Sequence, residues 1–425
     1  MLHEEILIGV ICLRVAVVKM LTAVSDSYWS DRKHRALKFV LLIGVVSFFA
    51  DFTYEGARSI TGPYLAILGA SATIVGVVAG LGELLGYGLR LFSGRLSEKT
   101  GKFWPITLVG YVVQMSCVPL LALAGNWPVA ALLIIGERVG KAIRNPPRDV
   151  MLSHATKEMG YGWGFGIHEA LDQLGALFGP LVAASVLARS GLYQPAFAVL
   201  LLPGFLTLLL LVTARLQYPR PEELETHAAD ANAAGLPRIF WIYFAGACLV
   251  AAGFADFSLA AYHFEKTAVI PKVWVPVFYS VAMAVSGIGS LIFGRIFDRT
   301  GFRILLPLTL ISAASTPLLF LGDFRVALLG AAVWGLGIGV HESIIPAAVA
   351  IIVPANRRPS AYGIFTAGYG VLWFLGSVLI GVLYDVSLPI LIAFSMAAEL
   401  AAIPFFVIVR RQMNDDAKSV DSSIR

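Results

Sequence analysis

Apolar stretches of about twenty residues follow one another along most of this chain and constrain its fold more than any other feature. A helix of that length crosses the hydrocarbon core of a bilayer. Hydrophobic residues make up 58% of the sequence and charged residues 14%, too few charges to cover a water-soluble protein of this size. The sequence therefore predicts an all-α integral membrane protein with twelve transmembrane helices, at 37–60, 72–93, 103–124, 128–146, 163–188, 195–215, 237–262, 273–294, 302–321, 325–348, 359–384 and 388–409.

A polar stretch at 216–236 separates six predicted spans from six. The predicted parts are an N-terminal cytoplasmic or interfacial segment (1–36), a six-helix bundle (37–215), a cytoplasmic linker (216–236), a second six-helix bundle (237–410) and a cytoplasmic tail (411–425). Residues 6–24 are apolar but carry Arg14 and Lys19. We interpret them as an interfacial helix or as residues upstream of a start at Met20, rather than as a thirteenth span, because an even number of spans fits the rest.

Lys and Arg are distributed unevenly between the two sides of the membrane. With the amino terminus inside, twenty of them fall on the cytoplasmic side. The opposite side receives only Arg189, Lys266, Lys272 and Arg325, with Arg58 near its border. Under the positive-inside rule this asymmetry predicts that both termini are cytoplasmic. The net charge of +5 then reports orientation, and we expect no nucleic-acid partner.

A short motif after the second predicted span has an echo in the second half of the chain. Residues 94–102 read GRLSEKTGK, and residues 294–301, which begin 200 positions later, read GRIFDRTG. The sequence FADF at 49–52 recurs at 254–257, and Glu137 recurs as Glu342, both 205 positions later. These matches indicate two halves in parallel repeat, which is one of the architectures of secondary transporters.

On these motifs the chain resembles the major facilitator superfamily over residues 37–410. The loop at 94–102 keeps the family's glycines, acid–base pair and following bases, with Glu98 where Asp is usual. GERVG at 136–140 resembles the family's span-4 motif, with Arg138 as its arginine. GALFGP at 175–180 resembles the span-5 motif associated with antiporters, but Ala183 and Ala184 stand where glycines are typical, which weakens that inference.

The resemblance implies a bacterial efflux-type transporter whose two bundles alternate between outward-open and inward-open forms. It also implies that the loop after the second span stabilises the outward-open form. Glycine there permits close helix approach, and the acid can hold a neighbouring base or helix end. The gating residues predicted in the two loops are Gly94, Arg95, Glu98, Lys99, Gly101, Lys102, Gly294, Arg295, Asp298, Arg299 and Gly301.

Ionisable residues inside predicted spans are candidates for function, because a charge in the hydrocarbon core is costly. Ser47, Asp51, Glu55 and Arg58 share one face of the first span, and similar stripes occur in spans 2, 4 and 5. Proton coupling requires a carboxyl group that alternates between protonated and ion-paired forms. Our candidates for that role are Asp51, Glu55, Glu169 and Asp172.

Other polar and aromatic residues are predicted to line a central cavity, with an aromatic wall in the second half. An alternative is that Glu83–Arg90, Glu55–Arg58 and Glu137–Arg138 are structural ion pairs, although buried ions are a poor source of stability. The cavity candidates are Tyr54, Glu83, Arg90, Glu137, Arg138, Lys141, His168, Asp256, His263, His341, Glu342, Tyr369 and Trp373.

The histidines allow two interpretations. Imidazole together with carboxylate suits nickel, cobalt, iron or zinc, and His168, His341 and Glu342 are weak candidates for such a site. The other interpretation is that His168, His263 and His341 are hydrogen-bonded or relay protons. At the end of the fourth span, Pro146 and Pro147 are predicted to stop the helix. Arg144 and Arg148 would then lie at the cytoplasmic mouth, as an anchor and gate hinge or as a partner for Glu98 or an anionic substrate.

The sequence thus predicts a proton-coupled secondary transporter of the plasma (bacterial inner) membrane that exports a small organic solute or drug and acts as a monomer. A divalent transition-metal exporter is the first alternative, and a non-transporting membrane sensor or scaffold is the second. A P-loop is absent from the sequence, which disfavours ATP-driven transport. We expect no enzyme activity and no cofactor, with the proton gradient as the energy source.

Overall fold

The computed structural model describes residues 31–156, 161–220, 236–353 and 358–424, and every regular element in these ranges is a helix. Ten helical segments are long and apolar enough to cross a membrane. The predicted fourth span is α5 (Trp127–Thr156), whose charged residues set it apart from those ten. The predicted tenth span is the shorter α14 (Phe324–Gly339), continued by the π-helix η4 (Val340–Ile344) and α15 (Ile345–Ile352). The all-α membrane architecture is confirmed.

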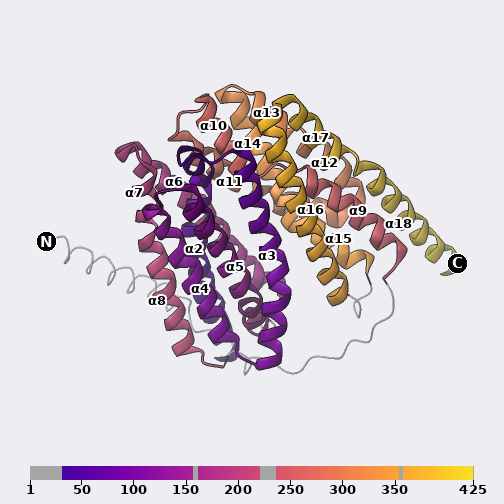
Figure 1. Cartoon of the computed structure of the whole chain (residues 1–425). Coiled ribbons are helices and arrows are strands. Elements are labelled where there is room, and N and C mark those ends of the chain that lie inside the picture. The colour runs from indigo at the N-terminus through magenta and orange to yellow at the C-terminus, as the bar shows by residue number, and fades with distance from the viewer. Residues whose placement is uncertain (1–30, 157–160, 221–235, 354–357, 425) are drawn as a thin grey trace.

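The first half of the chain forms one group of helices, coloured indigo to magenta in Figure 1. Within this group, the most extensive contact between two helices is that of α2 with α6. Besides α5, its elements are α2 (Asp31–Ile67), α3 (Ala72–Thr100), α4 (Phe103–Leu120), η1 (Leu121–Leu123), α6 (Tyr161–Ser190), α7 (Tyr193–Val199) and α8 (Leu201–Gln217). The first described helix, α2, begins at Asp31, inside the segment predicted to precede the bundle. Residues 1–30 and most of the predicted linker lie outside the described ranges.

The second half forms the other group, coloured rose-red through orange to yellow in Figure 1. Besides α14, η4 and α15, its elements are α9 (Arg238–Gly253), α10 (Phe257–Thr267), α11 (Trp274–Thr300), η3 (Gly301–Ile304), α12 (Leu305–Ala313), α13 (Ser315–Leu321), α16 (Arg358–Val386), α17 (Leu388–Leu400) and α18 (Ile403–Ile424). Several predicted spans are thus built from two helices. The seventh breaks at 254–256, where the Asp256 carboxylate accepts the Ser258 amide at 2.8 Å and caps α10.

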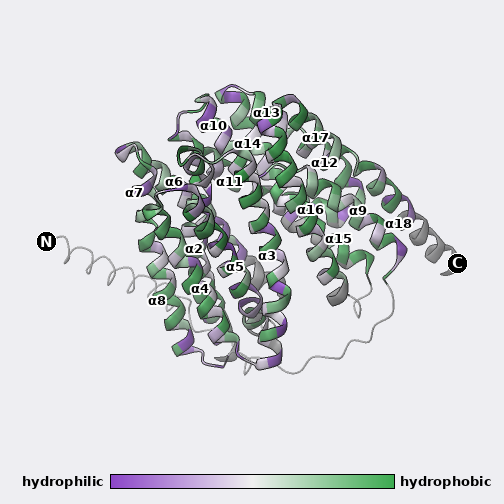
Figure 2. Cartoon of the chain, viewed as in Figure 1, coloured by the Kyte–Doolittle hydropathy of each residue, from purple (hydrophilic) through white to green (hydrophobic). Residues whose placement is uncertain are grey.

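Hydrophobic residues, green in Figure 2, predominate along the helices of both groups, and many of them are exposed on the outer surface. Leu123, Leu216 and Leu291 are each more than three-quarters exposed. Such a surface is stable in lipid and not in water. It confirms the inference that was drawn from composition.

Glycines set the closest helix approaches inside the first bundle. A side chain at Gly175 or Gly179 of α6 would collide with the carbonyl oxygens of Phe48 or Phe52 in α2. The glycines of the GALFGP motif therefore let two backbones touch, as small residues do at membrane helix interfaces. The motif explains why α2 and α6 form the most extensive helix pair.

The two bundles meet along α3–α16, α2–α10 and α6–α11. Many of these contacts lie near the turns that begin α3 and end α10. The Tyr262 hydroxyl donates to the Ala70 carbonyl at 3.2 Å, and the Thr73 hydroxyl donates to the Asp385 carboxylate at 2.6 Å. The C-terminal end of α3 and the start of α16 lie at the opposite end of the molecule, where the ribbons of the two groups diverge (Figure 1).

The predicted stop at Pro146 and Pro147 is wrong, because α5 continues through both prolines to Thr156. Each proline lacks a backbone donor, which weakens a helix interior. The arginines that flank the prolines compensate, since Arg144 and Arg148 both bind groups on α2 and so hold this part of α5 in place.

Candidate functional site

Arg144 lies fully buried in the middle of the first bundle. Its Nη2 is 3.4 Å from the Asp51 carboxylate of α2, and its Nη1 donates to the Tyr111 hydroxyl at 2.9 Å. Its Nε donates to the side-chain oxygen of Gln114, which also lies on α4. The guanidinium thus joins three helices. These several partners offset the cost of removing the charge from water. The complete burial of Arg144 contradicts the prediction that it lies at the cytoplasmic mouth.

One helical turn further on, Arg148 makes a second buried contact with α2. Its Nη1 donates to the Ser47 hydroxyl at 3.2 Å, while its Nη2 is 2.8 Å from the Asp149 carboxylate. The Ser47 hydroxyl is also 2.8 Å from Nε2 of His168 on α6. The first two residues of the stripe that the sequence predicts on α2, Ser47 and Asp51, therefore face α5 and α6.

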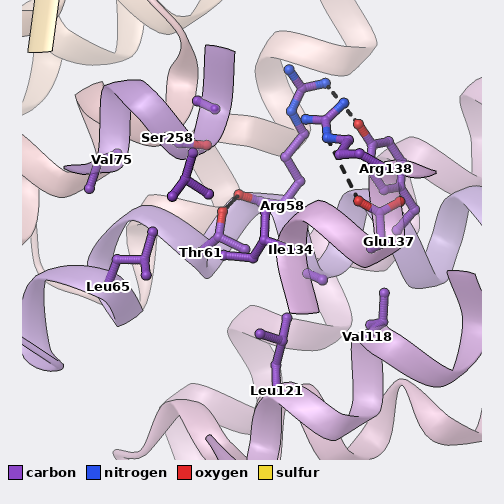
Figure 3. Close-up of a pocket in the computed structure, with 14 residues that line it drawn as sticks. Arg58, Thr61, Leu65, Val75, Val118, Leu121, Ile134, Glu137, Arg138 and Ser258 are labelled. Carbon is purple, nitrogen blue, oxygen red and sulfur yellow. Dashed lines mark hydrogen bonds and ion pairs between the residues drawn. The ribbon is translucent and has the colours of Figure 1, made fainter. Parts of the chain in front are cut away.

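Gln114 connects Arg144 to a second group of charges. Its amide nitrogen donates to the Glu137 carboxylate at 2.8 Å. Arg138 lies 3.7 Å from that carboxylate and 3.0 Å from Glu83 of α3. These charges border a cavity of about 30 Å³, enough for one or two water molecules. In Figure 3, Arg138 and Glu137 lie at one end of this cavity, and apolar side chains line the other.

Arg58 of α2 carries the network across to the second bundle. Its Nη2 lies 3.4 Å from Glu83 and 3.3 Å from Asp256. An unbroken series of polar contacts thus runs from Asp51 through Arg144, Gln114 and Arg138 to Asp256. The predicted ion pairs Glu83–Arg90 and Glu55–Arg58 are absent among the described contacts. Glu83 pairs with Arg58 and Arg138 instead.

One predicted proton-coupling residue and several predicted cavity residues of the first half make contacts that involve aromatic side chains. The Glu55 carboxylate accepts a hydrogen bond from the Tyr279 hydroxyl of α11, a second polar link between the bundles. The Tyr54 ring faces the Lys141 ammonium at 3.8 Å and the Arg138 guanidinium at 5.0 Å. Arg90 lies 5.4 Å from the centre of the Tyr87 ring. These are cation–π distances, which stabilise a partly desolvated cation.

Three predicted residues on α6 come together as a separate cluster. Ligand atoms of His168, Glu169 and Asp172 all lie within 4.8 Å of one another. Glu169 is exposed and accepts the Gln173 amide at 3.0 Å, while Oδ1 of Asp172 is buried without a hydrogen-bond partner. Imidazole and carboxylate atoms at this spacing are suited to holding a proton or a divalent transition metal.

A larger pocket of about 330 Å³ adjoins this cluster at the α6–α11 contact between the bundles. Glu169 and Gln173 line it on α6, and the other lining side chains are mostly apolar. Ile288 and Leu291 on its α11 wall are more than half exposed. The pocket therefore opens towards the lipid-facing surface, and its volume falls at the lower end of the range for small-molecule sites.

Apart from Asp256, which pairs with Arg58, the predicted residues of the second half whose side chains are described join neither the charge network nor the α6 cluster. Nδ1 of His263 is 2.8 Å from the Tyr384 hydroxyl, and Nδ1 of His341 is 2.8 Å from the Tyr369 hydroxyl. Trp373 packs edge-on against His341, with ring centres 5.3 Å apart. Both histidines are thus hydrogen-bonded, as one of the two interpretations of the sequence predicts. The side chain of Glu342 lies outside the described part of the structure.

Each of the two echoing loops ends its helix, α3 or α11, at a glycine with positive φ. Gly101 has φ 64° and Gly301 has φ 58°, values that favour glycine, and each amide bonds back to the helix it terminates. Gly294 has open space around it, and Gly94 has only a van der Waals neighbour on α5. The predicted close helix approach at these two positions is therefore not present in this conformation. The side chains of Glu98 and Asp298 lie outside the described part.

Tyr111, Gln114 and Tyr279 belong to the network but were missed in the sequence. Gln114 interrupts an otherwise apolar run in the third span, so a search for buried amides as well as charges could have found it. Tyr279 gave no such signal, because its partner Glu55 is 224 residues away in sequence.

A helical membrane protein with two bundles and an interior charge network has the construction of a secondary transporter. The sequence profile of the Major Facilitator Superfamily matches residues 40–377 and 274–422. The chain belongs to that superfamily and is a multi-pass integral membrane protein.

Particular relatives support this placement. An uncharacterized protein of Mycobacterium tuberculosis is 42% identical over 382 residues, covering 88% of this chain and 93% of that one. Multidrug resistance protein MdtH of Edwardsiella ictaluri is 28% identical over 159 residues, 36% of this chain and 38% of its own. The crystal structure of a bacterial homolog of the human lysosomal transporter Spinster, inward-facing and unoccupied, superposes with a TM-score of 0.63 at 13% identity over 90% of this chain and 96% of that chain.

Proposed function

We propose that this protein is a proton-coupled exporter of apolar or cationic organic solutes in the plasma membrane. The observation that carries the proposal is the pocket of about 330 Å³ between α6 and α11. An apolar wall with a carboxylate at its edge fits a lipophilic cation, because burial of its hydrocarbon part is favourable and Glu169 meets its charge. The partial relative named as a multidrug resistance protein is consistent with this substrate class.

The pocket and the buried carboxylates are adjacent, which is what coupling requires. Asp172 is three residues from Glu169 and belongs to the same cluster, and Ser47 connects His168 to Arg148. A cation that binds at Glu169 and a proton that binds at Asp172 or Asp51 would then compete for negative charge. Each ligand can shift the equilibrium between two conformations only through such a difference in affinity.

The conformation is the inward-open state in this proposal. The bundles touch near the turns at 68–71 and 268–273, which the distribution of Lys and Arg assigns to the extracellular side. Arg58, Asp256 and Glu83 hold that side closed. Alternation would separate these groups and bring the cytoplasmic ends of α3 and α11 towards the opposite bundle.

The experiment is transport in inverted membrane vesicles under an imposed pH gradient, with a panel of fluorescent lipophilic cations. We expect uptake that depends on the gradient in the wild type and is lost in Glu169→Gln. Glu265→Gln is the matched control, because Glu265 bonds the Tyr193 hydroxyl at 2.7 Å near the other end of α6, and it should transport normally. Substrate uptake at the same rate with and without the pH gradient would exclude proton coupling.

Export of a divalent transition metal is the second candidate, and the His168–Glu169–Asp172 cluster favours it. In that case the cluster would bind the cargo itself. Vesicle uptake of Ni²⁺, Co²⁺, Fe²⁺ and Zn²⁺ measured beside the organic panel separates the two. Metal uptake that is abolished by His168→Gln, with no organic transport, would favour the metal exporter and contradict the organic one.

A further inference from the structure

Glu399 of α17 is fully buried inside the second bundle, and among the described residues neither of its carboxyl oxygens has a hydrogen-bond partner in good geometry. It lies apart from the network between Asp51 and Asp256. Its neighbours on α17 and α9 are held firmly, because the Ser395 hydroxyl one turn earlier donates to the Gly253 carbonyl at 2.6 Å. Gly253 itself approaches the Glu399 side chain so closely that a methyl group there would touch it.

The surroundings of Glu399 contain few polar groups. The Ser312 hydroxyl of α12 is the polar group that lies beside the carboxyl group, although the two side chains do not meet in good hydrogen-bond geometry. Tyr369 of α16 faces this region, and the titratable groups around it in the second bundle are Cys248 and Tyr243 on α9 and His341 on η4. All four are uncharged or weakly basic, so no cation among the described side chains balances a carboxylate at this position.

His341 also has a buried polar atom without a described partner, and its side chain lines the same cavity as Ser312. Its Nδ1 bonds the Tyr369 hydroxyl, while its Nε2 is buried and has no partner among the side chains that the structure describes. His341 and Ser312 both line a cavity of about 10 Å³, together with Thr309. A cavity of that size and polarity suits one water molecule. The π-helix that carries His341 is itself a feature often found at functional positions.

An ionised carboxylate without a partner in such an interior is strongly disfavoured, and the group holds a proton instead. A single water in the cavity would connect Nε2 of His341 to the Ser312 hydroxyl, and the hydroxyl lies beside the carboxyl. Hydroxyl, water and imidazole can each accept and donate a proton. The arrangement therefore provides both a proton carrier and a path away from it.

We propose that Glu399, Ser312 and His341 form a proton-binding site in the second bundle, separate from the charge network of the first. Glu399 is the group that carries the proton, and His341 is the base at the other end of the path. The use of this proton in transport rests on the proposed function above. The occupancy of the site does not, and it can be measured in the resting protein.

Infrared spectroscopy of the full-length protein in liposomes tests the occupancy, because a protonated carboxyl group has its own carbonyl stretching band. We expect the spectrum of the wild type minus that of Glu399→Gln at neutral pH to contain this band. Asp256→Asn is the matched control, since Asp256 is equally buried but ion-paired with Arg58. Its difference spectrum should lack the band. Absence of the band from the Glu399 difference spectrum overturns the proposal.

A second variant keeps the test decisive if Glu399→Gln does not fold. Ser312→Ala retains the carboxyl group and removes its polar neighbour, so we expect the same band to shift in frequency. An unshifted band contradicts the proposed path through Ser312.

Transport separates the two proposals. Glu399→Gln should lose gradient-driven uptake while it still binds substrate. A wild-type protein without gradient-driven uptake that nevertheless shows the Glu399 band would overturn the proposed function and leave the proton site intact. Full gradient-driven uptake in Glu399→Gln would overturn the coupling role.

Discussion

Nη2 of Arg58 in α2 lies 3.3 Å from Oδ2 of Asp256 at the start of α10, and this ion pair joins the two halves of the protein. The same guanidinium nitrogen lies 3.4 Å from Glu83 in α3. One side chain of the first bundle therefore holds carboxylates from both bundles. Separation of the bundles at this end must break the contact with Asp256 while the contact with Glu83 can persist. The Arg58–Asp256 pair therefore stabilises the state in which the two bundles are in contact at this end.

Removal of the negative charge of Asp256 should favour separation of the bundles at this end. Asp256→Asn keeps the amide acceptor that caps α10 but loses the ion pair, at a cost of about 1.5–3 kcal/mol to the closed form. Electron–electron distance measurements between spin labels at Leu192 and Val269 should report a larger population of long distances. Asp323→Asn is the matched control, because Asp323 also caps a helix but makes no ion pair with a described residue. Identical distance distributions in both variants would show that the pair does not hold this end closed.

The Asp51 carboxylate should be essential for coupling and dispensable for folding. Asp51→Asn preserves an oxygen near Arg144 but cannot bind and release a proton. We expect monodisperse protein with gradient-driven uptake reduced by about 100-fold or more, the range for loss of a group that transfers protons. Asp149→Asn should have little effect, since the Asp149 side chain is 47% exposed and bonds only Arg148 among the described residues. Uptake at the wild-type level in Asp51→Asn would remove Asp51 from the mechanism.

The backbone contact of α6 with α2 predicts a strong stability effect. Gly175→Ala places a methyl group against the Phe48 carbonyl oxygen, so the two helices must move apart and lose packing. We expect a destabilisation of about 1–3 kcal/mol, as for overpacked cores, measured as a lower melting temperature by fluorescence-detected gel filtration. Gly88→Ala on α3 is the control, because no atom lies within 4 Å of the new methyl group. A protein with unchanged melting temperature in both cases would contradict the close approach.

Filling the α6–α11 pocket should block transport without disturbing the fold. Ala284→Phe projects a ring from the α11 wall into the pocket and should abolish uptake of the largest organic substrates first. Ala188→Phe adds the same ring at an exposed position near the end of α6 and serves as the control. Equal uptake by the two variants across the substrate panel would mean that cargo binds elsewhere.

Much of the candidate site can be recognised in the sequence, because a charge inside a membrane span is costly and therefore rare. Asp51, Arg144 and Glu137 stand out in apolar runs, and helical spacing alone places Ser47 and Asp51 on one face. The pairing of these groups is not visible in the same way. Glu83 could meet Arg90 on its own helix by spacing, yet it contacts Arg58 and Arg138, because the choice depends on how α2, α3 and α5 are rotated against one another.

The sequence by itself determined the membrane architecture, its division into two halves and the identity of most interior charges. These follow from local hydropathy and from motifs, which need no knowledge of distant contacts. Only the tertiary structure decided that α5 continues past Pro146, that Glu55 bonds Tyr279 and that Glu399 lies without a partner. Each of these depends on side chains brought together from separate helices, and the packing of helices sums many weak contacts that no single stretch of sequence contains.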